Sequence, residues 1–272
     1  MNDLSRLCIH TATTKPWSVE MAVEEYARSG VRGITVWRDA LAGRDPAAVG
    51  RRISDAGLEV VSLCRGGFFP AVGADARKRA IDDNLRAVKE AEALGAPLIV
   101  LVCGADAAQP LESSRAQIAE GITAVGKRAA EAGVKLAVEP LHPMYADTRS
   151  AVNTMQSAND MCEHLGDPNV GVAVDVYHIW WDPNAIGEIQ RCGAAGRLFA
   201  FHVCDWNVPT RDFLLDRELM GEGCIDIRRF REAVDSSGFS GFIEVEIFST
   251  QYWSTEQSLY LQKVISAYRQ HV

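Results

Sequence analysis

Short runs of apolar residues recur along the whole chain and are separated by longer stretches in which apolar residues return with helical spacing. The runs are rich in Val, Ile, Leu and Cys, which is typical of parallel strands buried on both faces. This pattern predicts eight strands, near residues 6–10, 33–37, 58–64, 97–103, 134–139, 170–176, 198–204 and 242–248.

The stretches between these runs carry the end signals of helices. Ser18 and Asp45-Pro46 stand where two helices should begin, and glycines such as Gly57 and Gly95 stand where helices should end. Such residues satisfy the backbone groups that a helix leaves unpaired at its ends. We therefore expect helices over 19–29, 46–56, 75–94, 113–132, 149–165, 183–192, 226–237 and 255–270.

The alternation of strands and helices continues without a linker or a low-complexity segment from residue 1 to residue 272. It predicts one domain over 1–272, a single (β/α)8 TIM barrel of the α/β class. A doubly wound open sheet is the main structural alternative, but no G-x-G-x-x-G motif follows the first predicted strand. The longest connections follow strands, so the loops should build a pocket at the C-terminal end of the barrel.

Composition and charge narrow the function classes. The chain is 47% hydrophobic and 24% charged, which suits a globular core. A net charge of −8 disfavours a nucleic-acid partner, and no basic run suggests a membrane surface. The seven cysteines form no C-x-x-C pair, and no apolar leader opens the sequence. We expect a reduced, cytoplasmic protein with neither nucleic acid nor membrane as a partner.

Four predicted strands end in side chains that bind metals, namely Glu139, Asp175, His202 and Glu246. The C-terminal ends of parallel barrel strands meet at one rim, where barrel enzymes have their active sites. Three carboxylates and one imidazole suit a divalent ion, with Mn²⁺ and Mg²⁺ ahead of Zn²⁺. Two residues before the first three of these side chains lies an alanine, which fits the narrow interior of a barrel.

The last predicted strand contains a second acidic residue on the same face. Glu244 lies two residues before Glu246 and should sit one layer deeper in the barrel. A buried charge there requires a partner, and Lys135 is the expected one because it also lies low on an inward face. The alternative is that Glu244, and not Glu246, is the metal ligand.

At these segments the chain resembles a known family. The residues EPLHP, VAVDVYHIWWDP, AFHVCDW, MGEGCIDI and GFIEVEIF are similar to those of the xylose isomerase-like barrels, the sugar phosphate isomerase/epimerase group. The resemblance implies the same four metal ligands and a metal-dependent isomerase or epimerase of a small keto-sugar or related polyol or keto acid. The expected reaction removes a proton next to a metal-bound carbonyl and passes through an enediolate.

The resemblance also implies roles for individual residues. Glu139 and Glu246 would serve as base and acid, while His178 and His142 would hold or relay protons at substrate hydroxyls. Ketose 3-epimerases of this kind carry a second Glu after the fifth strand and an Arg soon after the strand-7 His, and both are missing here. The nearest replacement for the arginine is Arg211. The other expected substrate-binding residues are His10, Trp37, Arg38 and Trp206, although Trp206 suits core packing equally well.

Three other functions are weighed against this one. A metal-dependent lyase or dehydratase, acting on an inosose or a 3-keto-glycoside, would begin with the same proton abstraction. An endonuclease with a three-zinc cluster is disfavoured because the chain has six His and a net negative charge. A non-catalytic sugar-binding barrel is disfavoured because it should have lost some of the four ligands, and all four are present. Mn²⁺ is the expected cofactor, with Mg²⁺, Co²⁺ and Zn²⁺ left open, and a homo-oligomer is expected from the resemblance alone.

Overall fold

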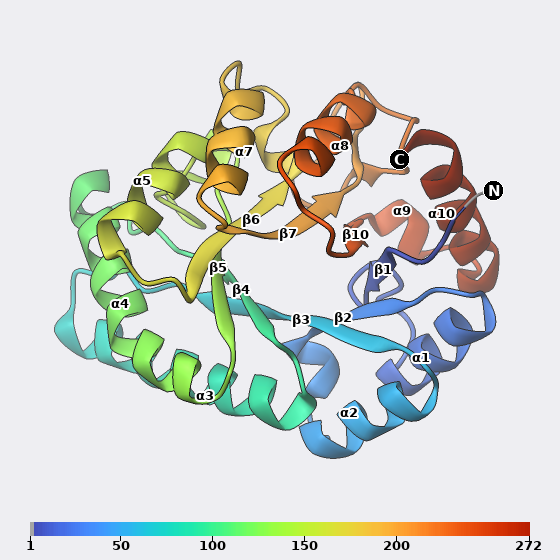
Figure 1. Cartoon of the computed structure of the whole chain (residues 1–272), viewed down its shortest axis with the longest axis horizontal. Helices are drawn as coiled ribbons and strands as arrows, with labels where there is room; N and C mark the ends of the chain where they lie inside the picture. Colours follow the sequence, from blue (N-terminus) through green and yellow to red (C-terminus); the bar gives the residue numbers. More distant parts are fainter. Residues whose placement is uncertain (1–2) are drawn as a thin grey trace.

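The computed structural model describes residues 3–272 and shows a closed barrel of parallel strands. Around the barrel the order is β1-β10-β7-β6-β5-β4-β3-β2. Figure 1 shows these strands in the middle of the molecule with the helices around them. The strands are β1 (Leu7–His10), β2 (Gly33–Trp37), β3 (Glu59–Gly67), β4 (Leu98–Val102), β5 (Lys135–Val138), β6 (Val170–Asp175), β7 (Leu198–Val203) and β10 (Ile243–Val245).

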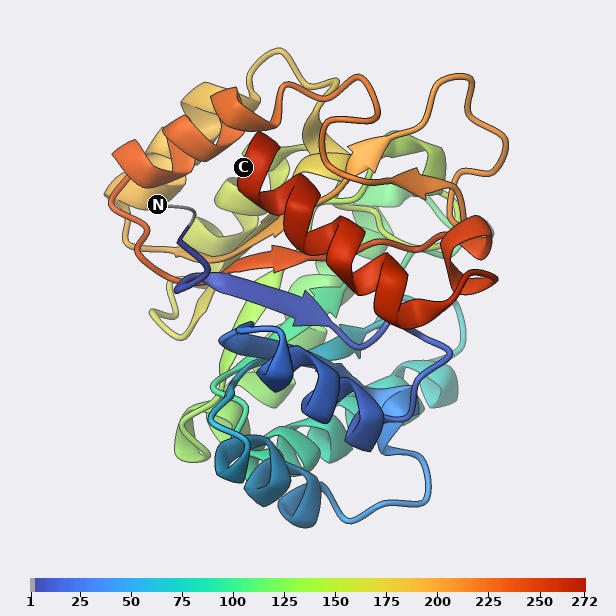
Figure 2. The same ribbon diagram turned by 90° about the vertical axis from the view of Figure 1, so that its right-hand side faces the viewer.

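The first and last barrel strands close the sheet. β1 pairs in parallel with β10 and with β2, so that Cys8 lies opposite both Glu244 and Gly33. Figure 2 shows β1 beside the C-terminal part of the chain, which is drawn in red. Closure leaves no free edge in the barrel, and it places the first and last barrel strands side by side.

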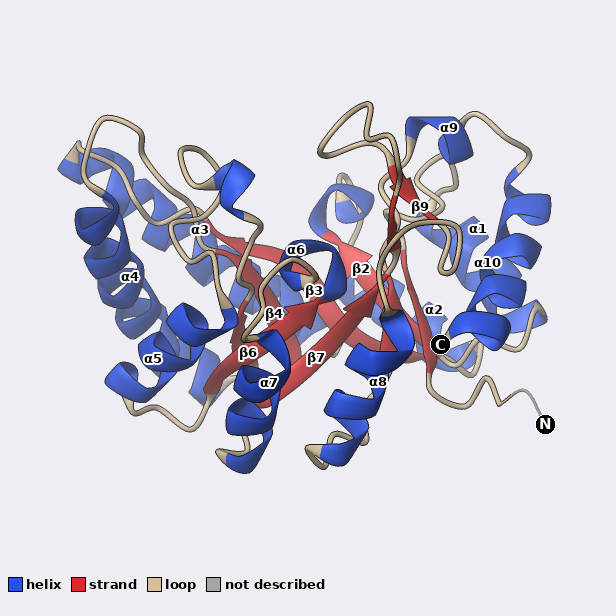
Figure 3. Cartoon of the chain, turned by 90° about the horizontal axis from the view of Figure 1, so that it is seen from above, coloured by secondary structure: helices blue, strands red, loops and turns tan. Residues whose placement is uncertain are grey.

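Helices form the outer layer, as Figure 3 shows by colour. The longer ones are α1 (Val19–Arg28), α2 (Pro46–Asp55), α3 (Ala74–Leu94), α4 (Leu111–Glu131), α5 (Met155–Leu165), α7 (Ala185–Ala194), α8 (Ile227–Ser236) and α10 (Gln257–His271). Each turns its apolar side to the strands, and together they enclose the main core. The short elements are η1 (Arg38–Leu41), η2 (Pro143–Tyr145), α6 (Val176–Ile179), α9 (Thr250–Trp253) and the hairpin β8 (Asp205–Trp206) with β9 (Arg217–Glu218).

The predicted barrel and its eight strands are confirmed, and the helix ends agree closely except at one place. The helix expected over 149–165 begins at Met155 instead. Thr154 caps it, since its hydroxyl accepts the Ser157 backbone N–H. The residues before it extend the barrel rim: Ser150 bridges Gly104, and the Val152 carbonyl accepts the Leu141 N–H. These backbone bonds compete with helix formation and delay its start.

The barrel interior is filled by a small cluster separate from the main core. It contains the alanines that the sequence places below the ligands, and its members are Cys64, Leu98, Val100, Ala137, Ala173 and Ala200. Small side chains at this level leave room for larger polar groups in the layer above.

Among the described residues, no helix is both long enough and apolar enough to cross a membrane.

Candidate metal centre and active site

Four buried side chains meet at the C-terminal end of the barrel. Glu139 directly follows β5, Asp175 ends β6, His202 lies in β7 and Glu246 directly follows β10. These strands are neighbours in the sheet, and Asp175 pairs with His202 in register. One ligand atom from each of the four residues lies within 4.8 Å of the others. The structure thus brings together all four residues that the sequence singled out as ligands.

The donor set fits a divalent ion. His202 Nδ1 and Glu139 Oε1 lie 3.2 Å apart as an ion pair, but neither atom forms a hydrogen bond within residues 3–272. Buried polar atoms without a hydrogen bond are rare, and convergence on a shared cation would satisfy both of them. Asp175 is oriented by the backbone, because its Oδ1 accepts the Tyr177 N–H at 2.9 Å. Carboxylate and imidazole ligands of this kind suit Mn²⁺, Mg²⁺, Co²⁺ and Zn²⁺.

Arg217 is the functional residue that sequence reasoning missed. It lies in β9, and the β8–β9 hairpin folds its side chain back over the four ligands. Its Nη1 donates to Glu246 Oε2 at 2.8 Å and to Asp175 Oδ2 at 3.1 Å. The guanidinium also lies 4.3 Å from the centre of the Tyr177 ring. A two-residue strand inside a long loop has no periodic pattern, so hydrophobic spacing did not mark this position, and the arginine expected after the strand-7 His was assigned to Arg211 instead.

The buried guanidinium shapes the charges around it. Burial raises the pKa of Asp175 to about 7, although Arg217 opposes this shift. Burial also raises the pKa of Glu246. The charges of Arg217 and His10 have the opposite and larger effect, so they hold the pKa of Glu246 well below its usual value. His178, whose Nε2 lies 3.3 Å from Arg217 Nη2, has its pKa lowered well below the ordinary value by burial and by Arg217. The site therefore contains an ionised Glu246 beside a neutral His178.

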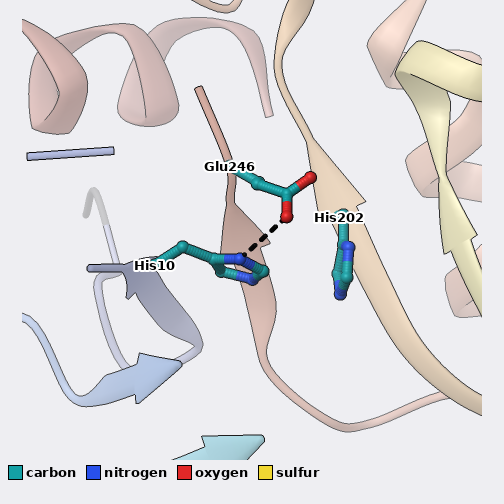
Figure 4. A group of neighbouring side chains, drawn as sticks. All are labelled: His10, His202 and Glu246. Atoms are coloured by element: carbon teal, nitrogen blue, oxygen red, sulfur yellow. Dashed lines mark ion pairs between the residues drawn. The ribbon is translucent and has the colours of Figure 1, made fainter. Parts of the chain in front are cut away.

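His10 and Glu244 form a layer beneath the ligands. His10 Nδ1 lies 3.1 Å from Glu246 Oε1, and its Nε2 lies 3.0 Å from Glu244 Oε2. Figure 4 shows His10, His202 and Glu246 pointing toward one another. Burial favours neutral His10, but Glu246 and Glu244 together raise its pKa to about 9. His10 therefore carries a positive charge and links the two glutamates.

The expected pairing of Glu244 with Lys135 is wrong. Besides His10, Glu244 Oε2 accepts from the hydroxyls of Thr35 at 2.5 Å and Ser62 at 3.3 Å. Lys135 is exposed, and its Nζ lies 4.6 Å from the centre of the Phe199 ring. The reason is register: Lys135 is the first residue of β5, at the opposite end of the barrel from the rim. The four-residue ligand group contains Glu246 and not Glu244.

The remaining predicted residues occupy three different places. Trp37 Nε1 lies 3.2 Å from His10 Nδ1, and Arg38 forms ion pairs with Asp83 and Glu90. Both line a cavity at the barrel mouth. His142 and Trp206 lie in an aromatic group with ring centres 5.3 Å apart, and Trp206 is buried against Tyr177. Arg211 is largely exposed and is held by Asp216 and Gln251, so the structure does not bring it to the ligands.

Comparison with known proteins agrees with this geometry. The family described as xylose isomerase-like TIM barrel matches residues 23–270. The chain belongs to the xylose isomerase-like TIM barrel family. A protein of Sinorhizobium meliloti 1021 with a solved structure is 44% identical, with a TM-score of 0.95 and 99% of each chain covered. The solved IOLI protein with a bound zinc atom has the same fold, with a TM-score of 0.84 over 98% of this chain and 99% of its own, at 20% identity.

Two characterised relatives carry different activities. The inosose isomerase of Halalkalibacterium halodurans is 26% identical over 178 residues, which cover 63% of this chain and 61% of that protein. The 3-dehydroshikimate dehydratase of Pseudomonas aeruginosa is 28% identical over 240 residues, covering 84% of this chain and 36% of that protein. The matched part thus spans less than two thirds of either relative. Both are enzymes, one an isomerase and the other a dehydratase.

Proposed function

We propose that this protein is a metal-dependent enzyme that moves a proton next to the carbonyl of a small keto-sugar, polyol ketone or keto acid, and so acts as an isomerase or epimerase. The single observation that carries the proposal is the convergence of Glu139, Asp175, His202 and Glu246 within 4.8 Å at the barrel rim. All four would hold the ion, for which we propose Mn²⁺ first. When bound, a divalent ion supplies Lewis-acid polarisation of a substrate carbonyl.

Two carboxylates are available to move the proton. Glu139 and Glu246 directly follow β5 and β10, which β6 and β7 separate in the barrel, so they approach the centre from different sides. Glu246 is kept ionised by Arg217 and His10, which also lower its proton affinity, and it would accept the substrate proton as a carboxylate. The second carboxylate can then return a proton to the neighbouring carbon or to the opposite face.

His178 would orient the substrate without adding charge. Its Nδ1 is buried and has no hydrogen-bond partner among residues 3–272, and its pKa lies well below the ordinary histidine value because of burial and Arg217. A neutral imidazole with a free nitrogen can bind a hydroxyl. His142, placed among Trp181 and Trp206, would contact a more distant part of the substrate.

A dehydratase on the same barrel is the second candidate. The observation that favours it is the match to 3-dehydroshikimate dehydratase over 84% of this chain. Both reactions begin with removal of a proton next to a carbonyl, and they differ in whether a leaving group then departs. The residues that would take the proton are the same in both cases.

Mass spectrometry in D₂O separates these outcomes. Ketoses, inososes and 3-dehydroshikimate would each be incubated with protein loaded with Mn²⁺, and with Glu246→Gln protein as a control. Deuterium uptake without other mass change supports the isomerase or epimerase, and loss of water supports the dehydratase. The absence of exchange on every substrate, with the metal bound, would contradict the proposed function.

A further inference from the structure

A cavity of about 460 Å³ opens at the barrel mouth, and the four ligand residues are not among the residues that line it. Cys64 lines it and also packs with Ala137, Ala173 and Ala200 directly below the ligands. Trp37, whose indole nitrogen lies 3.2 Å from His10 Nδ1, lines the same cavity. A molecule held by the four ligand residues would enter this space if it extended past Cys64 and Trp37.

The cavity wall carries more positive than negative side chains. Lys15, Arg38, Arg65 and Arg149 line it, against Asp39 and Asp83. Arg38 is already paired, since it donates to Asp83 and Glu90. Across the part of the chain that the structure describes, the side chains of Lys15, Arg65 and Arg149 form no hydrogen bond or ion pair, and Arg149 Nε is fully buried.

These three cations contact aromatic rings and not carboxylates. Arg65 lies 4.2 Å from the centre of the Phe68 ring, Arg149 lies 5.5 Å from that of Tyr145, and Lys15 Nζ lies 4.9 Å from that of Trp253. A ring face attracts a cation but accepts none of the in-plane N–H groups of a guanidinium. The donors of Arg65 and Arg149 thus remain available to a ligand.

The backbone holds both arginines in place. The register of β3 against β4 shifts between Cys64 and Gly66, and this bulge lets the consecutive residues Cys64 and Arg65 both face the cavity. The Arg149 carbonyl accepts the Gly104 N–H at 2.7 Å, next to the bridge between Gly104 and Ser150. Burial and the neighbouring charge of Arg149 lower the pKa of Arg65. Two like charges brought together in a cavity cost free energy unless a ligand compensates them.

We propose that Arg65 and Arg149 bind an anionic group of the substrate, a carboxylate or a phosphate, so that the enzyme acts on an acidic ketone and not on a neutral sugar. This inference rests on the proposed function and names its substrate class. The planar fork of a guanidinium matches two oxygens of either anion, and Lys15 adds charge at the exposed edge of the cavity.

Isothermal titration calorimetry at constant ionic strength tests the proposal without turnover. Fructose, fructuronate and fructose 6-phosphate form a series in which only the terminal group changes, and inorganic phosphate titrated into metal-free protein reports on the anion site without coordination to Mn²⁺. We expect phosphate to bind the metal-free protein, and at least one anionic ketose to bind the Mn²⁺-loaded protein about 10- to 100-fold more tightly than fructose. The tighter of fructuronate and fructose 6-phosphate identifies the anion as carboxylate or phosphate.

Variants locate the binding. Arg65→Gln and Arg149→Gln should each remove most of this preference, Arg65→Lys should restore part of it, and Arg191→Gln should not change it, because Arg191 lies on α7 paired with Asp160 and Glu163. Circular dichroism confirms that each variant is folded. Wild-type protein that binds neither phosphate nor an anionic ketose would overturn the proposal, as would glutamine variants that bind them undiminished.

Different experimental results would refute the proposed function and the proposed anion site. Deuterium exchange that is as fast on neutral ketoses as on acidic ones would refute the anion site and leave the isomerase intact. Anion binding through Arg65 and Arg149, with no exchange on any ketone, would leave the anion site intact and refute the isomerase.

Discussion

Arg217 compensates two buried acidic side chains at once. One nitrogen of its guanidinium contacts both Asp175 and Glu246, and 3% of its side chain is exposed. Removing one partner of a buried ion pair leaves the other charge without compensation, which destabilises a protein by about 3–5 kcal/mol. A divalent ion between the same carboxylates would take over this role, so the stabilising effect of Arg217 should depend on whether metal is present.

Substitution Arg217→Gln tests this dependence. In EDTA we expect the variant to lose about 3 kcal/mol of unfolding free energy, and the loss should shrink when Mn²⁺ is added. Chemical denaturation with and without metal measures both values. Arg191→Gln, which removes exposed ion pairs, should cost no more than about 1 kcal/mol in either condition. An Arg217→Gln protein as stable as wild type in EDTA would contradict the electrostatic account.

A second prediction at the residue scale concerns Glu246. Because it is both a ligand and a proton acceptor in the proposed reaction, Glu246→Gln should lower the exchange rate in D₂O by about 10²–10⁴-fold with the fold intact. Exchange rates, far-ultraviolet circular dichroism and bound metal would be measured on the same samples. The exposed Glu24→Gln is the matched control. Unchanged exchange in Glu246→Gln would remove Glu246 from the site.

The sequence predicts the four ligands, which lie at strand ends, but not Arg217, which lies in a long loop. Glu139, Asp175, His202 and Glu246 follow or end hydrophobic strands, and strand parity assigns them to one face. Arg217 reaches the site only because a long loop returns as a two-residue hairpin strand. Lys135 was misplaced because the same parity argument does not say how far along the barrel axis a residue lies.

At the scale of elements, the bulged end of β3 forms one side of the mouth. Gly67 has φ of +105°, and a Cβ there would lie 2.0 Å from the Val102 carbonyl oxygen. The Gly67 N–H donates to the Asn84 side chain of α3, which also donates back to the Gly67 carbonyl. Position 67 therefore requires glycine, because β3 and β4 lie too close together there for a side chain.

Gly67→Ala should destabilise the protein by at least about 2 kcal/mol, because both the positive φ and the contact with Val102 become unfavourable. Gly187→Ala provides the contrast. Gly187 lies in α7 with open space around its would-be Cβ, so alanine there should stabilise the helix by about 0.5–1 kcal/mol. Thermal unfolding of both variants measures the difference. Equal effects of the two substitutions would contradict this account of the β3 end.

Helix α5 shows where element prediction fails. Apolar spacing and Gly166 identify its body and its end, but not its start at Met155. The preceding residues pair with Gly104 and Leu141 across the rim, contacts that no local pattern reveals. The same rim contacts fix Arg149, which lines the cavity at the mouth.

At the scale of the whole molecule, barrel closure assembles the site. His10 comes from the first strand and Glu244 and Glu246 from the last segment, and the pairing of β1 with β10 brings them into contact. The alternation of strands and helices was enough to predict this closure. The cavity and its charges were not predictable, because they depend on how the loops after β1, β2, β3, β5, β7 and β10 pack over the rim.

Calorimetric titration of Mn²⁺ into EDTA-treated protein tests the central claim that the four rim residues form one metal site. The account predicts one tight site per chain in wild-type protein, weakened by at least about 100-fold in Asp175→Asn and in His202→Ala and unchanged in Glu24→Gln. Wild-type protein that binds no divalent ion, or Asp175→Asn and His202→Ala proteins that bind it as tightly as wild type, would contradict the account.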